Sequence, residues 1–419
     1  MSETATRLFF DKAPGQTRIA VLDDTDRIHG IWFDPLHAPN LVGTVHQVRI
    51  ARLFLGQNRA IATLADGNEV SIRLRKADLE KMKQGALVVI TIVAAPRHGK
   101  VWQALIGGRL VGRDMILLAG LSPDVARFQL SSKINKEDRA RLLARLVDEA
   151  DAHLPSGFGI ILRRTAASVG DFGKIVGRLL AVWQDGLCAR SEMAGQLHDA
   201  GGLLGRIERL YPEASLLAVE DTEMLAAYRN AVDAAIDTAM AACVRLSCGG
   251  HLWCEQTHVL WSVDVDGGGC DDLFRLGMEA VDETARQMRL RSMSGPVMLD
   301  LPRLAPKQMR QVLARLSEQL AQDPRHPTLL GQSRSGLVEM TVPHGDATLH
   351  NVMRDSPAQE ALCLLRDITK SPSSSPLQLA VSQPVATWLR TQGKAALESL
   401  DRPVTLVVSS DADSMTLSK

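Results

Sequence analysis

The stretch GGHLWCEQTHVLWSVDVDGG at residues 249–268, followed by EAVDETARQMRLRSMSGPVMLDLPRL at residues 279–304, decides the fold of this 419-residue chain. Apolar and polar residues alternate in two of its segments. Apolar residues recur at helical spacing in a third segment and form a short continuous run in a fourth. These patterns predict strands at 251–254 and 259–266, a helix at 276–292 and a buried strand at 297–301. A strand hairpin followed by a helix and another strand indicates a mixed α/β sheet with helices packed on it.

Three aspartates stand at the ends of these predicted strands. Asp264 and Asp266 are two residues apart, so their carboxylates project to the same face of the sheet. Asp300 ends the apolar strand. Converging carboxylates are what a magnesium-dependent phosphodiesterase needs, because hard oxygen ligands hold the ion that activates water. Such acids also cap turns and helices, and the spacing alone leaves both interpretations open.

Elements of both kinds flank this stretch. Downstream, the pattern predicts a helix at 307–322, a strand at 336–341, a helix at 385–400 and a strand at 404–409. Upstream, it predicts a hairpin within 7–33, short strands within 40–107 with a brief helix at 78–83, helices at 137–154 and 172–183 around a strand at 159–165, and two or three helices within 192–244. Five short strands in about 70 residues are typical of a small barrel of the oligonucleotide-binding (OB) type.

We divide the chain into seven parts on these patterns. They are N-terminal strands of the core (1–36), an OB-type barrel (37–110), a region of strand and helices (111–190), a helical segment (191–248), the α/β region that holds the aspartates (249–345), a linker (346–376) and a small C-terminal α+β domain (377–419).

The net charge of zero hides an uneven distribution. The whole chain carries 48 basic and 48 acidic residues. Residues 41–110 hold eleven basic residues against four acidic ones, a net charge of +7. A barrel with this surplus of cations can attract an anionic partner such as nucleic acid.

Cysteines and apolar runs bear on metal content and location. The six cysteines are spread along a long chain, which favours reduced thiols. Four of them lie between 243 and 270 near His251 and His258, but none forms a CxxC pair, so we expect no structural zinc. The longest apolar run, 86–95, is too short to cross a bilayer, and no secretory pattern opens the chain, so we expect a cytoplasmic protein.

Ordered motifs over almost the whole chain resemble the bacterial ribonuclease E/G endoribonucleases. They are APGQTRIAVL at 13–22, the barrel at 40–107, GIILRRTA at 159–166, the glycine pair at 249–250 with EQT at 255–257, EA at 279–280, ARQMRLR at 285–291, LGQSRSGLVEMT at 330–341 and the tail from 377. The resemblance implies an RNase-H-like catalytic core with an inserted RNA-binding barrel. It also implies a 5′-sensor subdomain in 111–190, a DNase-I-like or RNase-H-like catalytic region in 249–345, and single-stranded RNA as partner.

The resemblance also assigns roles to single residues. Asp264 falls on the family's first magnesium ligand, and Asp266 falls where the family has an Asn that orients the reacting groups. With Asp300 these are the candidate catalytic residues, and Asp264 and Asp300 are the candidate metal ligands. Arg164 and Thr165 fall on the pair that grips a 5′-monophosphate, with Arg163 competing because one residue is inserted before them. The other candidate RNA contacts are Lys100 at the barrel's exit and Arg73, Arg75 and Lys76 within it.

This chain departs from the family pattern at the metal site and the zinc segment. The family's second metal ligand is the last Asp of Asp-Phe-Ile-Asp-Met, and this chain reads DLPRL at 300–304, which puts Arg303 in that place. The segment HNVMRDSP at 350–357 lacks the family's zinc-binding cysteines, and the run after the Glu-Met strand reads TVPH instead of Thr-Arg-Gln-Arg. The stacking aromatics of the barrel are replaced near Ile61 and Ile72, so phosphate contacts must supply most of the barrel's affinity for RNA.

Three interpretations follow. In the first, Arg303 pairs with Asp264 and Asp300 in place of the ion, and the chain binds RNA without hydrolysing it. In the second, the three aspartates form a rearranged magnesium site of an active endoribonuclease. In the third, the chain is a non-catalytic partner of an active ribonuclease, and both that association and a homo-oligomer stay open. The first is favoured because a guanidinium cannot lower the pKa of bound water as a divalent ion does.

Overall fold

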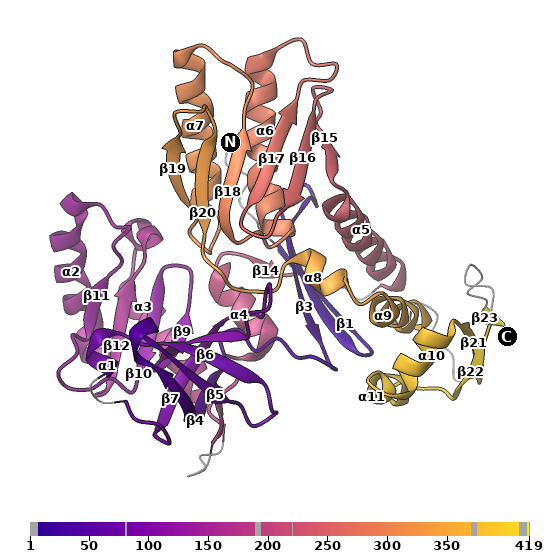
Figure 1. Ribbon diagram of the computed structural model, residues 1–419, viewed down its shortest axis with the longest axis horizontal. Helices are drawn as coiled ribbons and strands as arrows, with labels where there is room; N and C mark the ends of the chain where they lie inside the picture. The colour runs from indigo at the N-terminus through magenta and orange to yellow at the C-terminus, as the bar shows by residue number, and fades with distance from the viewer. Residues whose placement is uncertain are drawn as a thin grey trace.

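The protein is described from a computed structural model, which covers residues 7–79, 82–188, 194–219, 221–369, 375–409 and 417–418. Within these residues the chain forms five sheets with helices packed against them. Figure 1 shows the sheet with helices α6 and α7 at one end, the barrel at the other, and the C-terminal unit at the side.

The N-terminal sheet is built from β1 (Arg7–Ala13), β2 (Gln16–Leu22), β3 (Ile28–Pro35) and the short β14 (Ser215–Leu216). The predicted hairpin is confirmed as β2 and β3. Its turn is held by Asp23, whose Oδ1 accepts hydrogen bonds from the backbone N–H groups of Thr25 and Arg27. Helix α5 (Thr222–Met240) packs on this sheet through Val232 and Ile236.

The predicted five-stranded barrel is confirmed. Its strands are β4 (Val45–Phe54), β5 (Arg59–Thr63), β6 (Glu69–Arg73), β7 (Leu87–Ala94) and β8 (Trp102–Ile106). Their order is β4-β5-β6-β8-β7, and pairing of β4 with β7 closes the cylinder. A short helix α1 (Lys76–Leu79) follows β6, and β13 (Gly195–His198) adds to the outside of β4.

A separate four-stranded sheet follows the barrel. It contains β9 (Gly108–Val111), β10 (Met115–Ala119), β11 (Phe128–Leu130) and β12 (Phe158–Leu162), covered by α2 (Lys136–Ala150) and α3 (Phe172–Asp185). The helices and strand predicted here lie within two residues of these bounds, except that α2 ends four residues and β12 three residues earlier than expected. Helix α4 (Gly202–Leu210) then leads back to the N-terminal sheet.

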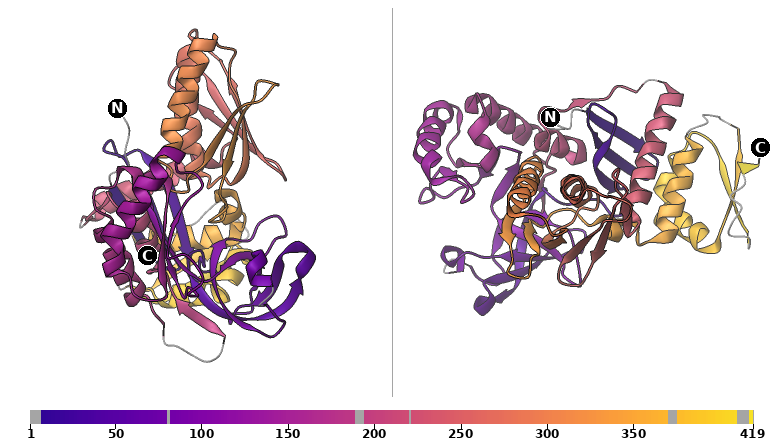
Figure 2. Two further views of the ribbon diagram at one scale, coloured as in Figure 1. Left: turned by 90° about the vertical axis from the view of Figure 1, so that its left-hand side faces the viewer. Right: turned by 90° about the horizontal axis from the view of Figure 1, so that it is seen from above.

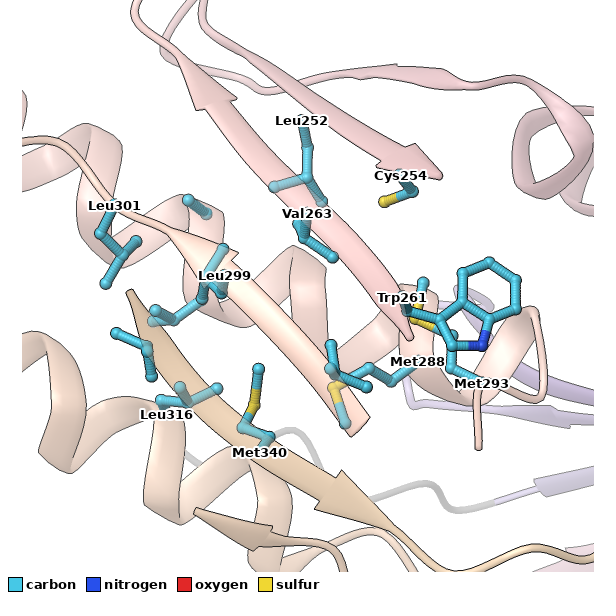
Figure 3. Packing of buried hydrophobic residues seen from close by; sticks show 14 of the residues in the cluster. Leu252, Cys254, Trp261, Val263, Met288, Met293, Leu299, Leu301, Leu316 and Met340 are labelled. Atoms are coloured by element: carbon cyan, nitrogen blue, oxygen red, sulfur yellow. The ribbon is translucent and has the colours of Figure 1, made fainter. Parts of the chain in front are cut away.

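The central sheet confirms the hairpin, helix and strand predicted from 251–301. Its order is β15-β16-β17-β18-β20-β19, with β15 (Cys243–Arg245), β16 (His251–Gln256), β17 (Trp261–Asp266), β18 (Gly295–Asp300), β19 (Thr328–Gln332) and β20 (Val338–Val342). Helices α6 (Leu273–Leu290) and α7 (Pro306–Ala321) cover one face of this sheet (Figure 2). Figure 3 shows the apolar residues of that face, among them Trp261, Val263 and Leu299, packed against the helices. The other face carries the alternate residues of each strand.

Two predictions are corrected in the C-terminal part. Residues 346–376, expected to be a linker, contain helices α8 (Leu349–Met353) and α9 (Ser356–Ile368), because α9 buries an apolar stripe against the C-terminal unit. That unit contains β21 (Leu377–Val381), α10 (Gln383–Arg390), α11 (Lys394–Glu398), β22 (Val404–Val408) and β23 (Leu417–Ser418). The single helix expected at 385–400 is two helices, since the chain bends at Gly393, where a Cβ would collide with the ring of Trp388.

Candidate functional site

The candidate acids lie on the open face of the central sheet. In β17, Trp261 and Val263 point into the core, so Asp264 and Asp266 point to the opposite side and are exposed. Strands β17 and β18 are parallel, and Asp264 is the register partner of Asp300. Asp300 is likewise exposed at the end of β18. The structure therefore brings Asp264 and Asp300 side by side, with Asp266 further along the same strand.

Arg303 does not occupy the space between the acids. The chain leaves the sheet at Leu301, whose side chain packs in the core, and Arg303 is exposed in the loop that leads to α7. Among the described residues, no ion pair within 4.0 Å joins Arg303 to Asp264 or Asp300, so the pairing expected from sequence is not formed.

The donor set on this face decides which metal it fits. No group of three or more His, Cys, Asp or Glu side chains in the described ranges is close enough to hold an ion. The cysteines between 243 and 270 are free thiols, and Cys254 is buried in the apolar core. Asp264 and Asp300 fit a magnesium ion that keeps several waters and takes further oxygens from a substrate phosphate, because Mg²⁺ is often held by one or two carboxylates. They do not fit a cage made by protein ligands alone.

Two further residues share the open face and were missed from sequence. Trp253 is the register partner of Asp264 across β16 and β17, and 42% of it is exposed. Glu339 on β20 is the register partner of Met298, next to Asp300 in β18. The alternation of HLWCEQ was a signal for Trp253, since Leu252 and Cys254 are core residues and the tryptophan between them must face outward. An exposed aromatic ring beside two carboxylates can stack on a nucleobase.

The acids stand at the end of the sheet that is remote from the barrel. In the antiparallel pair β18 and β20, Gly295 is opposite Val342. Beyond Val342 the chain meets the barrel, where the backbone N–H of Ala95 donates to the carbonyl of Gly345. Asp300 is at the other end of β18, about 17 Å along the strand at roughly 3.3 Å per residue. A polymer in contact with both the barrel and the acids would have to run along the open face (Figure 1).

Arg163 is fixed by the backbone around it. Its Nη1 donates to the carbonyl of Gly112 at 2.7 Å and to that of Arg113 at 3.4 Å. The Thr165 hydroxyl donates to the same Arg113 carbonyl at 3.0 Å. Burial lowers the pKa of Arg163 to about 10. The guanidinium and the hydroxyl predicted to meet a phosphate are thus both engaged with the backbone, and Arg163 acts as a structural residue.

Arg164 differs from Arg163 because part of its guanidinium has no partner. Its Nη2 is buried and makes no hydrogen bond. Lys133 lies close by, and burial followed by the charges of Arg164 and Arg163 lowers its pKa. The same two arginines and burial hold the pKa of His326 near 3, so its ring is neutral and its Nε2–H donates to the Arg113 carbonyl at 3.0 Å. We call Lys133, Arg163 and Arg164, together with the neutral His326 beside them, the cation cluster. Its three positive charges repel further cations and suit an anion.

The barrel cations are not gathered in one place. Strand β6 is parallel to β8, with Val70 paired to Trp102 and Arg73 paired to Leu105. Lys100 therefore lies beyond one end of this pair and Arg73 at the other end. The Arg75 guanidinium is held by Asp78, with Nε–Oδ2 and Nη2–Oδ1 distances of 3.0 and 3.1 Å. Ile72 is completely buried in the barrel core and Ile61 is buried too, so neither position offers a stacking surface.

The fold and these sites define a mixed α/β protein in which a closed five-stranded barrel and a cation cluster accompany a sheet face that carries acids. The model of the Ribonuclease E/G family matches residues 213–343, which include the whole central sheet. Relatives of this family align over about four fifths of the chain, so the chain is similar to the ribonuclease E/G family over most of its length.

The relatives include two proteins named Ribonuclease G and two named Ribonuclease E. Ribonuclease G of Escherichia coli (strain K12) is 23% identical over 395 residues, which cover 80% of this chain and 79% of the relative. Ribonuclease G of Haemophilus influenzae is 23% identical over 411 residues, covering 84% and 82%. Ribonuclease E of Escherichia coli (strain K12) is 26% identical over 193 residues, covering 41% and 18%, and Ribonuclease E of Buchnera aphidicola is 30% identical over 118 residues, covering 26% and 13%. No described helix is both long and apolar enough to cross a membrane.

Proposed function

We propose that this chain is a ribonuclease E/G-type RNA-processing protein that binds single-stranded RNA and senses its 5′ end. The match to the ribonuclease E/G family model and the names of the relatives support RNA as the partner. The basic barrel and the cation cluster supply charges that RNA phosphates require. The observation that carries the proposal is the buried, unpaired Nη2 of Arg164 inside a group of like charges.

A 5′-monophosphate would supply the negative charge and the hydrogen-bond acceptor that the cation cluster lacks. Its oxygens accept hydrogen bonds from Arg164 Nη2 and neutralise the repulsion between Arg164 and Lys133. Arg163 and Thr165 hold the Arg113 backbone in place and shape the site from behind. Of the two adjacent arginines, Arg164 is therefore the candidate for the phosphate, because Arg163 uses its donors on backbone carbonyls.

We further propose that hydrolysis by this chain is slow or absent. When bound, Mg²⁺ would supply an activated water and charge stabilisation at the phosphate. Asp264 and Asp300 would hold it from the open face of the sheet. Arg303 stands at the position of the family's second metal ligand, where it brings a positive charge to the loop beside Asp300 and contributes no oxygen ligand.

An active magnesium-dependent endoribonuclease is the second candidate. It is favoured by the direct register of Asp264 with Asp300 and by the exposure of both carboxylates to a substrate on the open face. Asp266, two residues along β17, would then orient the reacting groups.

Incubation with a 5′-monophosphorylated single-stranded RNA, with magnesium and with a chelator, separates the two candidates. We expect binding in both conditions and no cleavage above background. Magnesium-dependent cuts that Asp264→Asn abolishes would refute the non-hydrolytic proposal. Magnesium-dependent cleavage gained on Arg303→Asp, with an intact RNA in the wild type, would support it.

A further inference from the structure

Two hollows adjoin where the barrel meets β3, α8 and α9. The first has a volume of about 260 Å³, and three of the residues that line it are aromatic: Trp32, Phe33 and Trp102. Trp32 and Phe33 come from β3 and are each 8% exposed, while Trp102 begins barrel strand β8 and is partly exposed. The hollow is therefore an aromatic recess with a rigid inner wall on β3 and a mouth at the barrel.

The second hollow is cationic and opens directly from the first. Its volume is about 490 Å³, and its lining includes Arg97, Lys100 and Arg354. Trp102 and Asn351 line both hollows, so the recess and the cationic groove are continuous. Asn351 lies in α8, and its side-chain amide makes no hydrogen bond with any described residue.

The cations of this groove are not neutralised by the protein. Within the described residues, no ion pair within 4.0 Å includes Arg97, Lys100 or Arg354. The Arg97 Nη1 is buried and has no hydrogen-bond partner. Burial and then the charges of Arg97 and Lys100 hold the pKa of the neighbouring His344 near 4. Arg97 and Lys100 therefore act together on a side chain beside the groove.

The acids around the two hollows are already engaged. Asp346 is ion-paired with Arg206 at 2.7 Å and accepts a hydrogen bond from Asn40. Asp355 caps the start of α9 through the Ala358 backbone N–H. Glu69 lies 3.5 Å from Arg52. A negatively charged ligand in the groove would meet unpaired cations, and its nearest carboxylates already have partners.

We propose that this double hollow binds one nucleotide unit of single-stranded RNA, with its base in the aromatic recess and its phosphate in the cationic groove. Base stacking on the partly exposed ring of Trp102 tolerates any base, and guanidinium groups with a lysine suit the phosphate. Asn351 stands between the two and can donate to or accept from the base edge or the sugar. This inference rests on the proposed RNA binding and adds a site that is separate from the cation cluster and from the acid face.

The test compares two labelled single-stranded RNAs of equal length, one with all bases and one with abasic sugars, both with a 5′-hydroxyl. Fluorescence anisotropy in a chelator gives the Kd of the wild type, Trp102→Ala, Trp102→Phe and the control Leu36→Ala, which removes an exposed side chain beside the recess that does not line it. We expect Trp102→Ala to weaken binding of the complete RNA about tenfold, the loss of one base–aromatic stack. Binding of the abasic RNA should not change, and Trp102→Phe should bind like the wild type.

Folding and the source of the nucleotide need separate measurements. Thermal unfolding of each variant checks the fold, and Asn351→Ala, which removes no hydrogen bond of the protein, gives a second variant with an expected loss of a few-fold. Equal Kd values of wild type and Trp102→Ala for the complete RNA would overturn the proposal, as would the same loss for both RNAs. Quenching of tryptophan fluorescence by adenosine monophosphate, with no RNA bound at all, would contradict both RNA as the source and the proposed function. RNA binding with the wild-type Kd in both Trp102→Ala and Asn351→Ala would overturn this inference and leave the proposed function standing.

Discussion

The cation cluster and the acid face of the central sheet are built in opposite ways. In the cation cluster, the backbone carbonyl of Arg113 accepts three hydrogen bonds, from Arg163, Thr165 and His326. On the acid face, Asp264, Asp266 and Asp300 are exposed. A site held by buried contacts is preorganised for its ligand, whereas exposed carboxylates must be ordered by the ligand itself. Under the proposed function, the cation cluster would therefore bind a phosphate with little rearrangement, whereas the acid face would need its ligand to order the carboxylates.

The largest expected effect separates the two adjacent arginines of the cluster. Arg164→Ala should lower the affinity for 5′-monophosphorylated RNA about 10- to 100-fold, since a hydrogen bond to a charged group contributes roughly 1.5–3 kcal/mol. Affinity for the 5′-hydroxyl RNA should be unchanged. The matched variant Arg163→Ala should instead lower the melting temperature, because it removes donors from the Gly112 and Arg113 carbonyls. A loss of 5′-phosphate preference only in Arg163→Ala would reverse these roles.

The cluster should also make the protein sensitive to acid. His326 is 3% exposed, and its pKa is lowered from 6.5 to about 3, so the unfolded chain binds its proton at a higher pH than the folded one. Its contribution to stability is therefore complete above pH 6.5 and is lost as the pH falls toward 3. By pH 5 the loss is about 2 kcal/mol. Urea unfolding at pH 7.5 and pH 5 should show a smaller difference in His326→Gln than in the wild type, with the exposed His153→Gln as control. An unchanged difference would mean that His326 is not held neutral.

Trp253 tests whether RNA contacts the acid face of the central sheet. We expect Trp253→Ala to weaken RNA binding about fivefold, the lower end of a base–aromatic stack of ~1–3 kcal/mol. Trp253→Phe should retain most of the affinity. Filter binding at constant salt measures this, and wild-type affinity in Trp253→Ala would remove the open face from the path of the RNA.

The smallest effect concerns the barrel. Arg73→Ala should reduce the slope of log K against log salt by about 0.7, the expectation for one phosphate contact on a single strand. Arg390→Ala, an exposed arginine of α10, is the matched control and should leave the slope unchanged. A salt response that is flat in the wild type would exclude the basic barrel as a main RNA surface.

The sequence was most informative where apolar periodicity is strong. The hairpin, helix and strand within 251–301 and the closed barrel follow from alternation and helical spacing, because those patterns reflect burial directly. Strands β1 and β19 were missed. β1 carries a charged pair in its second half and β19 contains Gly331, at a bulge that interrupts its register. Helices α8 and α9 were not predicted, because residues 346–376 were interpreted as a linker that lacks the family's zinc-binding segment.

The side-chain contacts of the candidate sites were beyond sequence reasoning. The spacing of Asp264 and Asp266 predicted a shared face of the sheet, which the burial pattern of β17 bears out, and the register adds Asp300 to that face. The sequence could not place Arg303 in an exposed loop. Likewise, Arg163 and Arg164 are adjacent residues of the same type, so the sequence alone cannot assign them different roles. Only the positions of the Gly112 and Arg113 carbonyls distinguish the arginine that is tied to the backbone from the one with a free Nη2.

The most direct test of the account is the Kd for 5′-monophosphorylated single-stranded RNA in a chelator, for the wild type and for the double variant Asp264→Asn with Asp300→Asn. The account predicts that both bind tightly, that the double variant binds at least as well, and that both weaken steeply with salt, because cations and not a metal hold the RNA. Binding that requires magnesium and is lost in the double variant would contradict it.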